Sequence, residues 1–246
     1  MPGEVRVFPN LEGLSLAAAE SFADAAAEAI SQRGRFTVAL SGGSTPSRLY
    51  QLLTLPPLRQ RIDWSRCHLF WGDERLVPPD HADSNYRLAR ETLLDGVPLP
   101  VAQIHGVPVE VGEGNDVAQS YEEDLRDFFG RDELWPRFDL LLLGLGSDGH
   151  TASLFPGSPA LEESQRWVVA TPPGTLPPPV NRVTLTLPAI NAAREVLFLV
   201  AGADKAGVLH HVLQGDVGLP AARVRPAGGD LYWFVDMAAK ARSGGL

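Results

Sequence analysis

Short apolar segments rich in β-branched and aromatic residues recur along the chain and alternate with segments of helical pattern. The most apolar one, residues 138–145 (FDLLLLGL), is typical of a parallel strand covered on both faces. Residues 182–187 (RVTLTL) alternate, as a strand with one more solvated face would. Further strands are predicted at residues 36–40, 67–71, 195–201 and 230–235. Because strands that alternate with helices form βαβ units, the chain is expected to fold as an α/β protein with a mostly parallel sheet flanked by helices.

Helical patterns fill the intervals between these strands. They are predicted at residues 16–30, 84–94, 115–129 and 203–214. We expect Asn115 to cap the helix at 115–129 and Gly130 to end it. One further helix should begin after the strand at 36–40, with Thr45 as its N-cap and Pro46 in its first position. The proline-rich stretch 171–179 (TPPGTLPPP) has strand patterns on both sides, so we interpret it as a loop and residues 1–246 as a single domain.

The charge balance and the cysteine count exclude several classes of protein. The chain has 21 Lys+Arg and 30 Asp+Glu, which gives a formal net charge of −9. This balance argues against a general role in binding nucleic acid or a membrane surface, since both need a positive footprint. Cys67 is the sole cysteine, so a disulfide framework and a multi-cysteine metal site are excluded. Neither a signal peptide nor an apolar run of ~20 residues is present, so a cytoplasmic protein is expected.

A glycine-rich segment, Ser41 to Pro46 (SGGSTP), follows a predicted strand and opens a predicted helix. Glycines let a ligand approach the backbone closely, and the start of a helix offers free N–H groups at the positive end of its dipole. The segment therefore either cradles a phosphate or is an ordinary capped turn. It is not a Walker loop, because the GK[ST] element is missing.

A second loop, residues 144–150 (GLGSDGH), follows the most apolar strand and matches the pattern GxGxxG. The dinucleotide-binding fingerprint needs a long helix directly after the glycines, but Pro156 and Pro159 shorten the following segment. The loop instead places His150 at the carboxyl end of a strand, two residues after Asp148. Because histidine is easily poised as a general base near neutral pH, His150 is the candidate base. Asp148 either orients the loop or the imidazole, or caps its own turn.

Charged residues stand at the ends of other predicted strands. Asp73, Glu74 and Arg75 follow one strand, Arg182 begins another, and Lys205 lies in the first turn of a helix. Taken singly, each is most simply a solvated surface residue. Taken together, they would give an acidic protein its one positive pocket. Whether Asp73 or Glu74 faces that pocket stays open.

Five segments together carry a likeness to a known family. They are SGGSTP at 41–46, WGDERLVPPDHADSNY at 71–86, GLGSDGHTASLFPGS at 144–158, RVTLTLPAIN at 182–191 and GADKA at 202–206. In this order, and over nearly the whole chain, they resemble the 6-phosphogluconolactonases, which share a superfamily and a Rossmann-like parallel sheet with glucosamine-6-phosphate deaminase. The resemblance implies hydrolysis of 6-phospho-D-glucono-1,5-lactone to 6-phospho-D-gluconate in the oxidative pentose phosphate pathway, with no cofactor.

For this reaction, we expect His150 to take the proton of the attacking water and to return it to the ring oxygen that leaves. Asp73, Arg75 and Arg182 are expected to bind the substrate, Arg182 through either the phosphate or the oxyanion. The phosphate is expected on Gly42, Gly43, Ser44 and Thr45, with Lys205 in support. The expected partner is a small sugar-phosphate lactone, without nucleic acid, membrane or metal. A monomer or a weak homo-oligomer is expected.

Two other functions share parts of this pattern. The deaminase also has a glycine-rich phosphate loop and an Asp-Gly-His loop, but it typically carries Phe-Asn-Glu after that histidine, with the Glu involved in ring opening. Here the stretch reads Ser153-Leu154-Phe155-Pro156, so that acid is absent. A sugar-phosphate-sensing regulator would usually carry a further DNA-binding helical segment, which we do not expect in this acidic chain.

Overall fold

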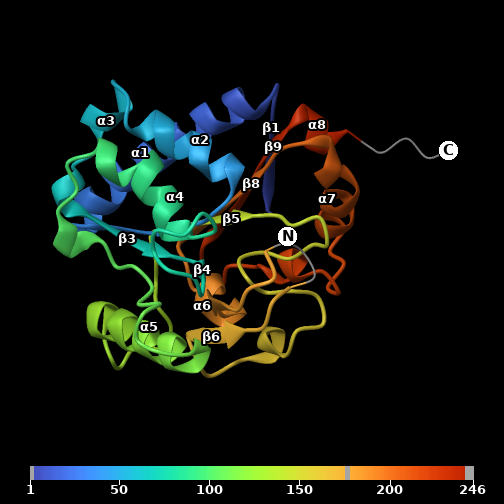
Figure 1. Cartoon of the computed structure of the whole chain (residues 1–246). Coiled ribbons are helices and arrows are strands. Elements are labelled where there is room, and N and C mark those ends of the chain that lie inside the picture. Colours follow the sequence, from blue (N-terminus) through green and yellow to red (C-terminus); the bar gives the residue numbers. More distant parts are fainter. Residues whose placement is uncertain (1–2, 175–177, 242–246) are drawn as a thin grey trace.

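A six-stranded sheet forms the centre of the computed structural model, which describes residues 3–174 and 178–241 (Figure 1). The strand order is β1-β9-β8-β5-β2-β3, and every neighbouring pair is parallel. The strands are β1 (Glu4–Phe8), β2 (Phe36–Leu40), β3 (Cys67–Trp71), β5 (Leu140–Gly144), β8 (Glu195–Val200) and β9 (Asp230–Asp236). The predicted α/β class with a mostly parallel sheet is therefore confirmed.

A smaller antiparallel sheet lies beside the large one. Its strands, in the order β4-β7-β6, are β4 (Asp73–Arg75), β7 (Arg182–Leu185) and β6 (Val168–Thr171). The predicted strand at 182–187 exists, but the expectation that one of its faces is more solvated is wrong, since all residues of β7 are buried. The prediction took the polar residue Thr184 as a sign of a solvated face. Its hydroxyl is instead fully buried and accepts a hydrogen bond from the Ser153 N–H at 3.2 Å.

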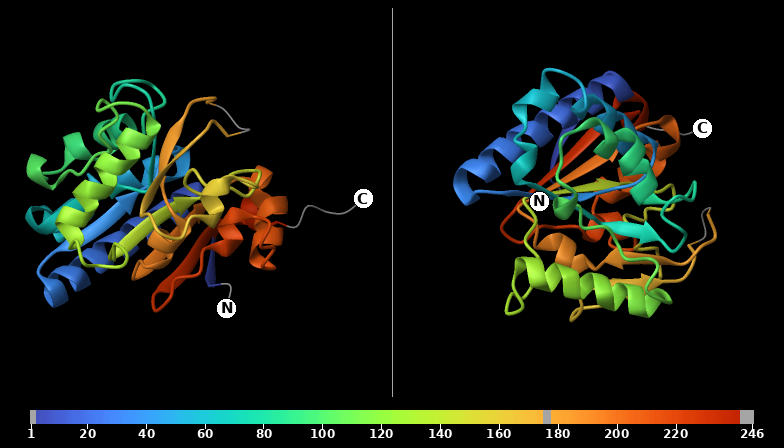
Figure 2. Two further views of the ribbon diagram at one scale, coloured as in Figure 1. Left: turned by 90° about the horizontal axis from the view of Figure 1, so that it is seen from below. Right: turned by 60° about the vertical axis from the view of Figure 1, so that its left-hand side comes forward.

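Helices cover both faces of the large sheet, as the two views of Figure 2 show. One face carries α1, α2 and α4, whose apolar residues form one core with β2 and β3. The other face carries α5, α6, α7 and the small sheet over a second core. The helices are α1 (Leu11–Arg33), α2 (Ser44–Leu53), α3 (Leu58–Arg61), α4 (Asn85–Thr92), α5 (Gly114–Phe129), α6 (Leu187–Asn191), α7 (Ala206–Leu213) and α8 (Met237–Lys240). Short 3-10 turns lie at Trp64–Arg66, Leu94–Gly96, Val101–Gln103, Pro159–Glu162, Ala203–Lys205 and Pro220–Arg223.

Several helix starts differ from the predicted ones. Helix α1 begins at Leu11 rather than at residue 16, because the side chain of Asn10 accepts a hydrogen bond from the Gly13 N–H at 3.0 Å. Helix α2 begins at Ser44, so Thr45 lies inside its first turn and is not the N-cap. Helix α5 begins at Gly114, which places Asn115 within the helix. Gly130 ends α5 as predicted, in a conformation with φ of 119°.

The order in which strands are added to the sheet reverses between β2 and β5. From β2 the chain passes to β3 on one side, and the later strands β5, β8 and β9 are added on the other side. In open α/β sheets the crevice at such a switch point, outside the carboxyl ends of the strands, is where ligands bind. The fold therefore places the loops after β2, β5 and β8 around one crevice.

Gly72 connects the large sheet to the small one. Its N–H donates to the carbonyl of Leu40 at the end of β2, and its carbonyl accepts from the N–H of Leu185 at the end of β7, both at 2.9 Å. Asp73 follows directly and begins β4. The predicted loop at 171–179 runs from β6 toward β7, and its residues 175–177 lie outside the described residues.

Candidate active site

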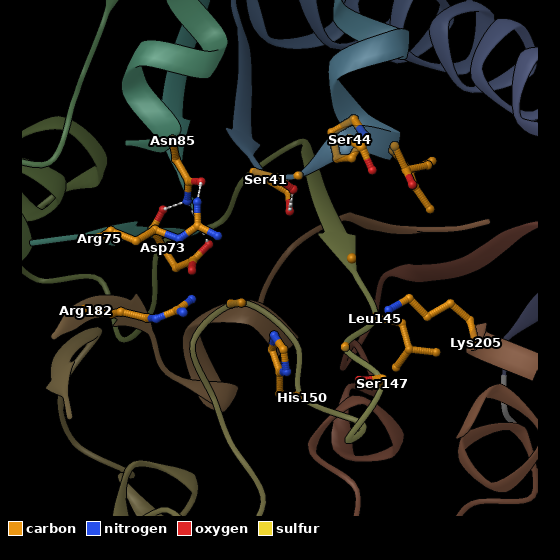
Figure 3. Close-up of a pocket in the computed structure, with 18 residues that line it drawn as sticks. Ser41, Ser44, Asp73, Arg75, Asn85, Leu145, Ser147, His150, Arg182 and Lys205 are labelled. Atoms are coloured by element: carbon orange, nitrogen blue, oxygen red, sulfur yellow. Dashed lines mark hydrogen bonds between the residues drawn. The ribbon is translucent and has the colours of Figure 1, made fainter. Parts of the chain in front are cut away.

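A pocket of about 260 Å³ opens at the carboxyl ends of β2, β5 and β8 (Figure 3). It brings together the glycine-rich loop, the loop after β5, strands β4 and β7 of the small sheet and the residue that precedes α7. The predicted site residues that line it are Gly42, Gly43, Ser44, Thr45, Asp73, Arg75, His150, Arg182 and Lys205. Asp148 does not line the pocket but contacts His150 from behind.

The glycine-rich loop is held at the end of β2 by a buried tyrosine. The hydroxyl of Tyr50 accepts from the Ser41 N–H at 3.0 Å and donates to the Ser41 carbonyl at 2.8 Å. A side chain at Gly42 would collide with the amide oxygen of Asn85, and Gly43 has a φ of 102°. No side chain caps α2 at Gly43, so the first N–H groups of α2 are left for a ligand. This is the geometry that binds a phosphate at a helix N-terminus.

His150 and Asp148 form a close pair on the loop after β5. Nδ1 of His150 lies 2.6 Å from Oδ1 of Asp148, which also accepts the backbone N–H of His150 at 3.1 Å. Burial opposes ionisation of Asp148, but the hydrogen bonds from His150 outweigh it, so the pKa of Asp148 is lowered. An ionised carboxylate only accepts hydrogen bonds, so Nδ1 is the donor of this pair, and in the neutral ring Nε2 is the acceptor. A side chain at Gly146 would collide with the His150 ring, which explains the glycine there.

Asn85 organises the opposite wall of the pocket. Its amide nitrogen donates to the carbonyl of Asp73 at 2.9 Å and lies 3.4 Å from the Asp73 carboxylate, while its amide oxygen accepts from Arg75. The other carboxylate oxygen of Asp73 accepts from the hydroxyl of Ser153 at 2.6 Å. Asp73 is therefore fixed from two sides, with its side chain turned to the pocket. The open question between the two acids is settled in favour of Asp73.

Glu74 points the other way and holds the start of α4. Its carboxylate accepts from the backbone N–H groups of Arg75, Asn85 and Tyr86, each at 2.7 Å. Burial raises the pKa of Glu74 to about 7, although these hydrogen bonds act in the opposite direction. Glu74 thus fixes the backbone of two pocket residues without reaching the pocket itself.

Two further cations face the pocket from different elements. Arg182 begins β7, is 3% exposed, and places its guanidinium 5.3 Å from the centre of the Phe155 ring. Its Nε is buried without a hydrogen-bond partner, and burial lowers its pKa. Lys205 lies across the pocket at the start of α7, where Nζ is 3.1 Å from the carboxylate of the exposed Asp204. Both cations hold donors that an anionic ligand can engage.

The sequence pattern did not single out Asn85 and Ser153 as site residues. Asn85 is twelve positions from Asp73 and Ser153 is eighty. Only the tertiary fold brings them together. The available signals were that Asn85 stands near a predicted helix start, soon after a charged strand end, and that both residues lie in the family-like segments 71–86 and 144–158. Gly42 and Asn85 are also far apart in the sequence, so their close approach could not be foreseen.

The arrangement places an imidazole, the N-terminus of a helix and several fixed polar side chains around one pocket. The ring of His150 reaches into the space between the Arg182 side and the Lys205 side of the pocket (Figure 3). Water or a small electrophile placed there would meet Nε2 of His150, while a phosphate could bind at the start of α2. Within residues 3–174 and 178–241, no three His, Cys, Asp or Glu side chains are grouped as metal ligands.

Known proteins share this fold and sequence. The profile of the family described as glucosamine-6-phosphate isomerases/6-phosphogluconolactonase matches residues 9–233. A 6-phosphogluconolactonase of Synechocystis sp. is 45% identical over 216 residues, 86% of each chain. A solved 6-phosphogluconolactonase structure from Trypanosoma cruzi has a TM-score of 0.86 at 34% identity and covers 96% of this chain and 95% of that one. A monomeric glucosamine-6-phosphate deaminase, 18% identical with a TM-score of 0.81 over 96% of this chain and 98% of that one, shares the fold. The chain therefore belongs to the glucosamine-6-phosphate isomerase/6-phosphogluconolactonase family.

Proposed function

We propose that this protein hydrolyses 6-phospho-D-glucono-1,5-lactone to 6-phospho-D-gluconate, the second step of the oxidative pentose phosphate pathway. The observation that carries the proposal is that His150, held by Asp148, lines the same pocket as the glycine-rich loop at the start of α2. The names of the Synechocystis and Trypanosoma cruzi relatives support the same reaction.

In the proposed mechanism, His150 activates water. Nε2 of His150 takes a proton from water while the water oxygen bonds to the lactone carbonyl carbon. The carbonyl electrons move onto its oxygen and form a tetrahedral oxyanion. When this intermediate collapses, the bond to the ring oxygen breaks and the protonated His150 returns a proton to that oxygen. Asp148 keeps the imidazole in the required tautomer throughout, and no covalent intermediate forms.

Binding of the phosphate positions the carbonyl at His150. We assign the phosphate to the N–H groups of Gly42, Gly43, Ser44 and Thr45, with Lys205 as a charged partner. Asp73 and Arg75 hold hydroxyl groups of the sugar acid. Arg182, with an unpaired buried Nε, binds either the phosphate or the developing oxyanion. Binding energy from the remote phosphate then serves to orient the reacting carbon.

Deaminase activity is the alternative within this fold. Its ring-opening acid would stand where this chain has Phe155 and Pro156, and the ring of Phe155 packs against His150 at 4.8 Å between centroids. An apolar ring there cannot transfer a proton. We therefore rank hydrolysis above deamination. A sugar-phosphate sensor is ranked lower still, because it would not need a base held by a carboxylate.

The proposal extends to the setting in which the enzyme works. Among the described helices, none has the length and apolar character to span a membrane. We propose that the enzyme acts in the cytoplasm on a free sugar-phosphate lactone, as a monomer or a weak homo-oligomer, without a cofactor or a nucleic-acid partner.

A direct assay tests the function. Freshly made 6-phosphorylated lactone is added to the enzyme, acid release is followed in a pH-stat, and spontaneous hydrolysis is subtracted. We expect enzyme-dependent hydrolysis and no ammonia from glucosamine 6-phosphate. Ammonia release at a rate comparable to lactone hydrolysis would reverse the ranking, and a rate no faster than the spontaneous one would refute the function.

A further inference from the structure

Four arginines gather at the amino ends of the central strands, at the end of the sheet away from the candidate active site. Arg33 and Arg35 precede β2, Arg137 precedes β5 and Arg194 precedes β8. They line a second pocket of about 470 Å³. The expectation of one positive pocket is therefore wrong, since this acidic chain has a second concentration of positive charge.

Asp139 serves as the scaffold of this arginine pocket. One of its oxygens accepts from the N–H and the hydroxyl of Thr37, both at 2.8 Å. The other lies 2.8 Å from Nε of Arg33 and 3.4 Å from Nε of Arg194. Because Asp139 is buried and engaged on both oxygens, it fixes two guanidinium groups and has little capacity to bind another donor.

The pocket keeps an excess of positive charge. Its four guanidinium groups face two carboxylates, the engaged Asp139 and the exposed Glu133. In the described part of the chain, neither Arg35 nor Arg137 forms an ion pair with a carboxylate, and Nε of Arg194 is buried without a hydrogen bond. Burial, together with the neighbouring charges of Arg137 and Arg33, lowers the pKa of Arg194. An anion bound here would relieve this repulsion and engage the free donors.

Two aromatic side chains complete the pocket and limit the choice of anion. Phe129 and Trp135 line it and are partly buried. Planar guanidinium groups match the geometry of a phosphate, and aromatic faces bind a ring or an apolar chain. We propose that this pocket binds a phosphorylated small molecule, with its phosphate among Arg35, Arg137 and Arg194 and its organic part against Phe129 and Trp135. This site is separate from the candidate active site and does not depend on the proposed function.

Nuclear magnetic resonance can test the site, because it separates the two pockets by residue. The probe is phenyl phosphate, titrated into uniformly ¹⁵N-labelled protein at constant ionic strength. We expect saturable shifts of the Thr37 amide, the Arg194 Nε–H and the Trp135 indole N–H. Shifts at Ser44 report the candidate active site separately. Methyl phosphate should bind the arginine pocket several-fold more weakly, because it lacks the ring.

The variant Arg35→Ala/Arg137→Ala removes the two arginines that hold no ion pair, so Asp139 keeps its partners. Loss of two charge-assisted contacts should lower the affinity for phenyl phosphate, measured from the shifts at Thr37 and Arg194, at least ~10-fold. Arg6→Ala/Arg61→Ala removes the same charge from exposed sites and should bind as the wild type does. The single variant Arg137→Ala should be intermediate, and its spectrum tests the site if the double variant does not fold.

Three results would overturn the proposal. The shifts at Thr37 and Arg194 could fail to saturate, or potassium chloride at equal ionic strength could reproduce them. Affinity at these residues could also be the same in Arg35→Ala/Arg137→Ala as in the exposed-site control.

Discussion

At the scale of single residues, one ring nitrogen carries the proposed chemistry. Asp148 accepts both the backbone N–H and the ring Nδ1–H of His150, so the imidazole has one orientation and one tautomer. Because the pKa of Asp148 is lowered, its carboxylate is ionised at neutral pH and can accept both bonds. Nε2 is the atom that remains for proton transfer.

Replacing His150 with asparagine removes this base while keeping a polar side chain of similar reach. We expect kcat to fall by ~10²–10⁴, with KM nearly unchanged, because general-base catalysis contributes that much. Steady-state kinetics on the phosphorylated lactone measure it. His211→Asn, on the exposed face of α7, is the matched control. A His150 variant that keeps more than a third of the kcat would remove His150 from the mechanism.

Lys205→Ala and Arg182→Ala separate phosphate binding from oxyanion stabilisation. Removing one charge-assisted contact to the phosphate should lower kcat/KM by ~10–150-fold. For Lys205→Ala this loss should appear with the phosphorylated lactone and be small with plain glucono-1,5-lactone, which has no phosphate. If Arg182 binds the phosphate, Arg182→Ala should lower kcat/KM in the same selective way as Lys205→Ala. If Arg182 stabilises the oxyanion, Arg182→Ala should lower kcat/KM equally for both lactones. Equal losses on both lactones for Lys205→Ala would contradict its assignment to the phosphate.

Local spacing explains which site residues the sequence revealed. His150 and Asp148 stand two positions apart in a loop after an apolar strand, so their contact follows from the chain itself. Asp73, Arg75 and Arg182 were recognisable as charges at strand ends. The hydrogen bonds that Asn85 and Ser153 form with Asp73 depend on how distant segments pack in the fold. No local sequence pattern predicts these contacts.

At the scale of elements, the turn from β2 into α2 depends on two glycines with different physical reasons. Gly43 adopts a backbone conformation that favours glycine, with a φ of 102°. Gly42 is needed for space, because a side chain there would strike the amide oxygen of Asn85. The anion cradle and the Asn85 wall therefore pack together at one point.

Gly42→Ala should displace both the glycine-rich loop and the Asn85 side of the pocket. Alanine would displace Asn85 from Asp73 and Arg75, so we expect kcat/KM to fall at least ~10-fold and stability to drop by about 1–3 kcal/mol, typical of overpacking. Kinetics and urea denaturation measure the two effects. Gly106→Ala is the control, since its added carbon would lie at an ordinary 3.4 Å from Tyr86. Wild-type kinetics in Gly42→Ala would show that the Asn85 wall does not matter.

The predicted elements were most accurate where strands are fully buried. The limits of β2 and β3 match the prediction, because every residue of β2 and every residue of β3 except His68 is buried, which leaves a clear, mostly apolar run. Strands β4 and β6 were not predicted, because three or four residues are too few to show a pattern. Strand β7 was misinterpreted because Thr184 is buried and hydrogen-bonded rather than solvated.

At the scale of the whole molecule, the large sheet separates two cores that share its strands. Trp64 and Trp71 lie in one core, and Trp167 and Trp233 in the other. We propose that residues 1–246 form one domain and therefore unfold as one unit. Urea denaturation followed by circular dichroism and by tryptophan fluorescence should give coincident curves. Two separated transitions would show that the cores unfold independently.

Stability should also depend on pH through Glu195, at the start of β8. Burial, followed by the charge of Asp230, raises the pKa of Glu195 to about 7, above that of the unfolded chain. The folded protein then binds the proton of Glu195 more tightly than the unfolded chain does. The contribution of this protonated group to the free energy of unfolding is therefore fully present below pH ~4.5 and is lost as the pH rises through about 7. Glu195→Gln should therefore stabilise the protein by about 1–2 kcal/mol at pH 8, allowing for partial exposure, and little at pH 4.5. Urea denaturation at the two pH values measures this, with the exposed Glu20→Gln as control. The same effect at both pH values would contradict the role of ionisation.

Gly72 joins the two sheets through main-chain atoms alone: its N–H donates to Leu40 and its carbonyl accepts from Leu185, each at 2.9 Å. Asp73 and Arg75 follow it on one wall of the pocket, while His150 stands on the loop after β5. A joint of this kind has no side chain to lose. The identity of the side chains at Leu40 and Leu185 therefore does not enter these two bonds. A substitution at either position that leaves the backbone in place should keep Asp73 where it is, even if it loosens the packing around it.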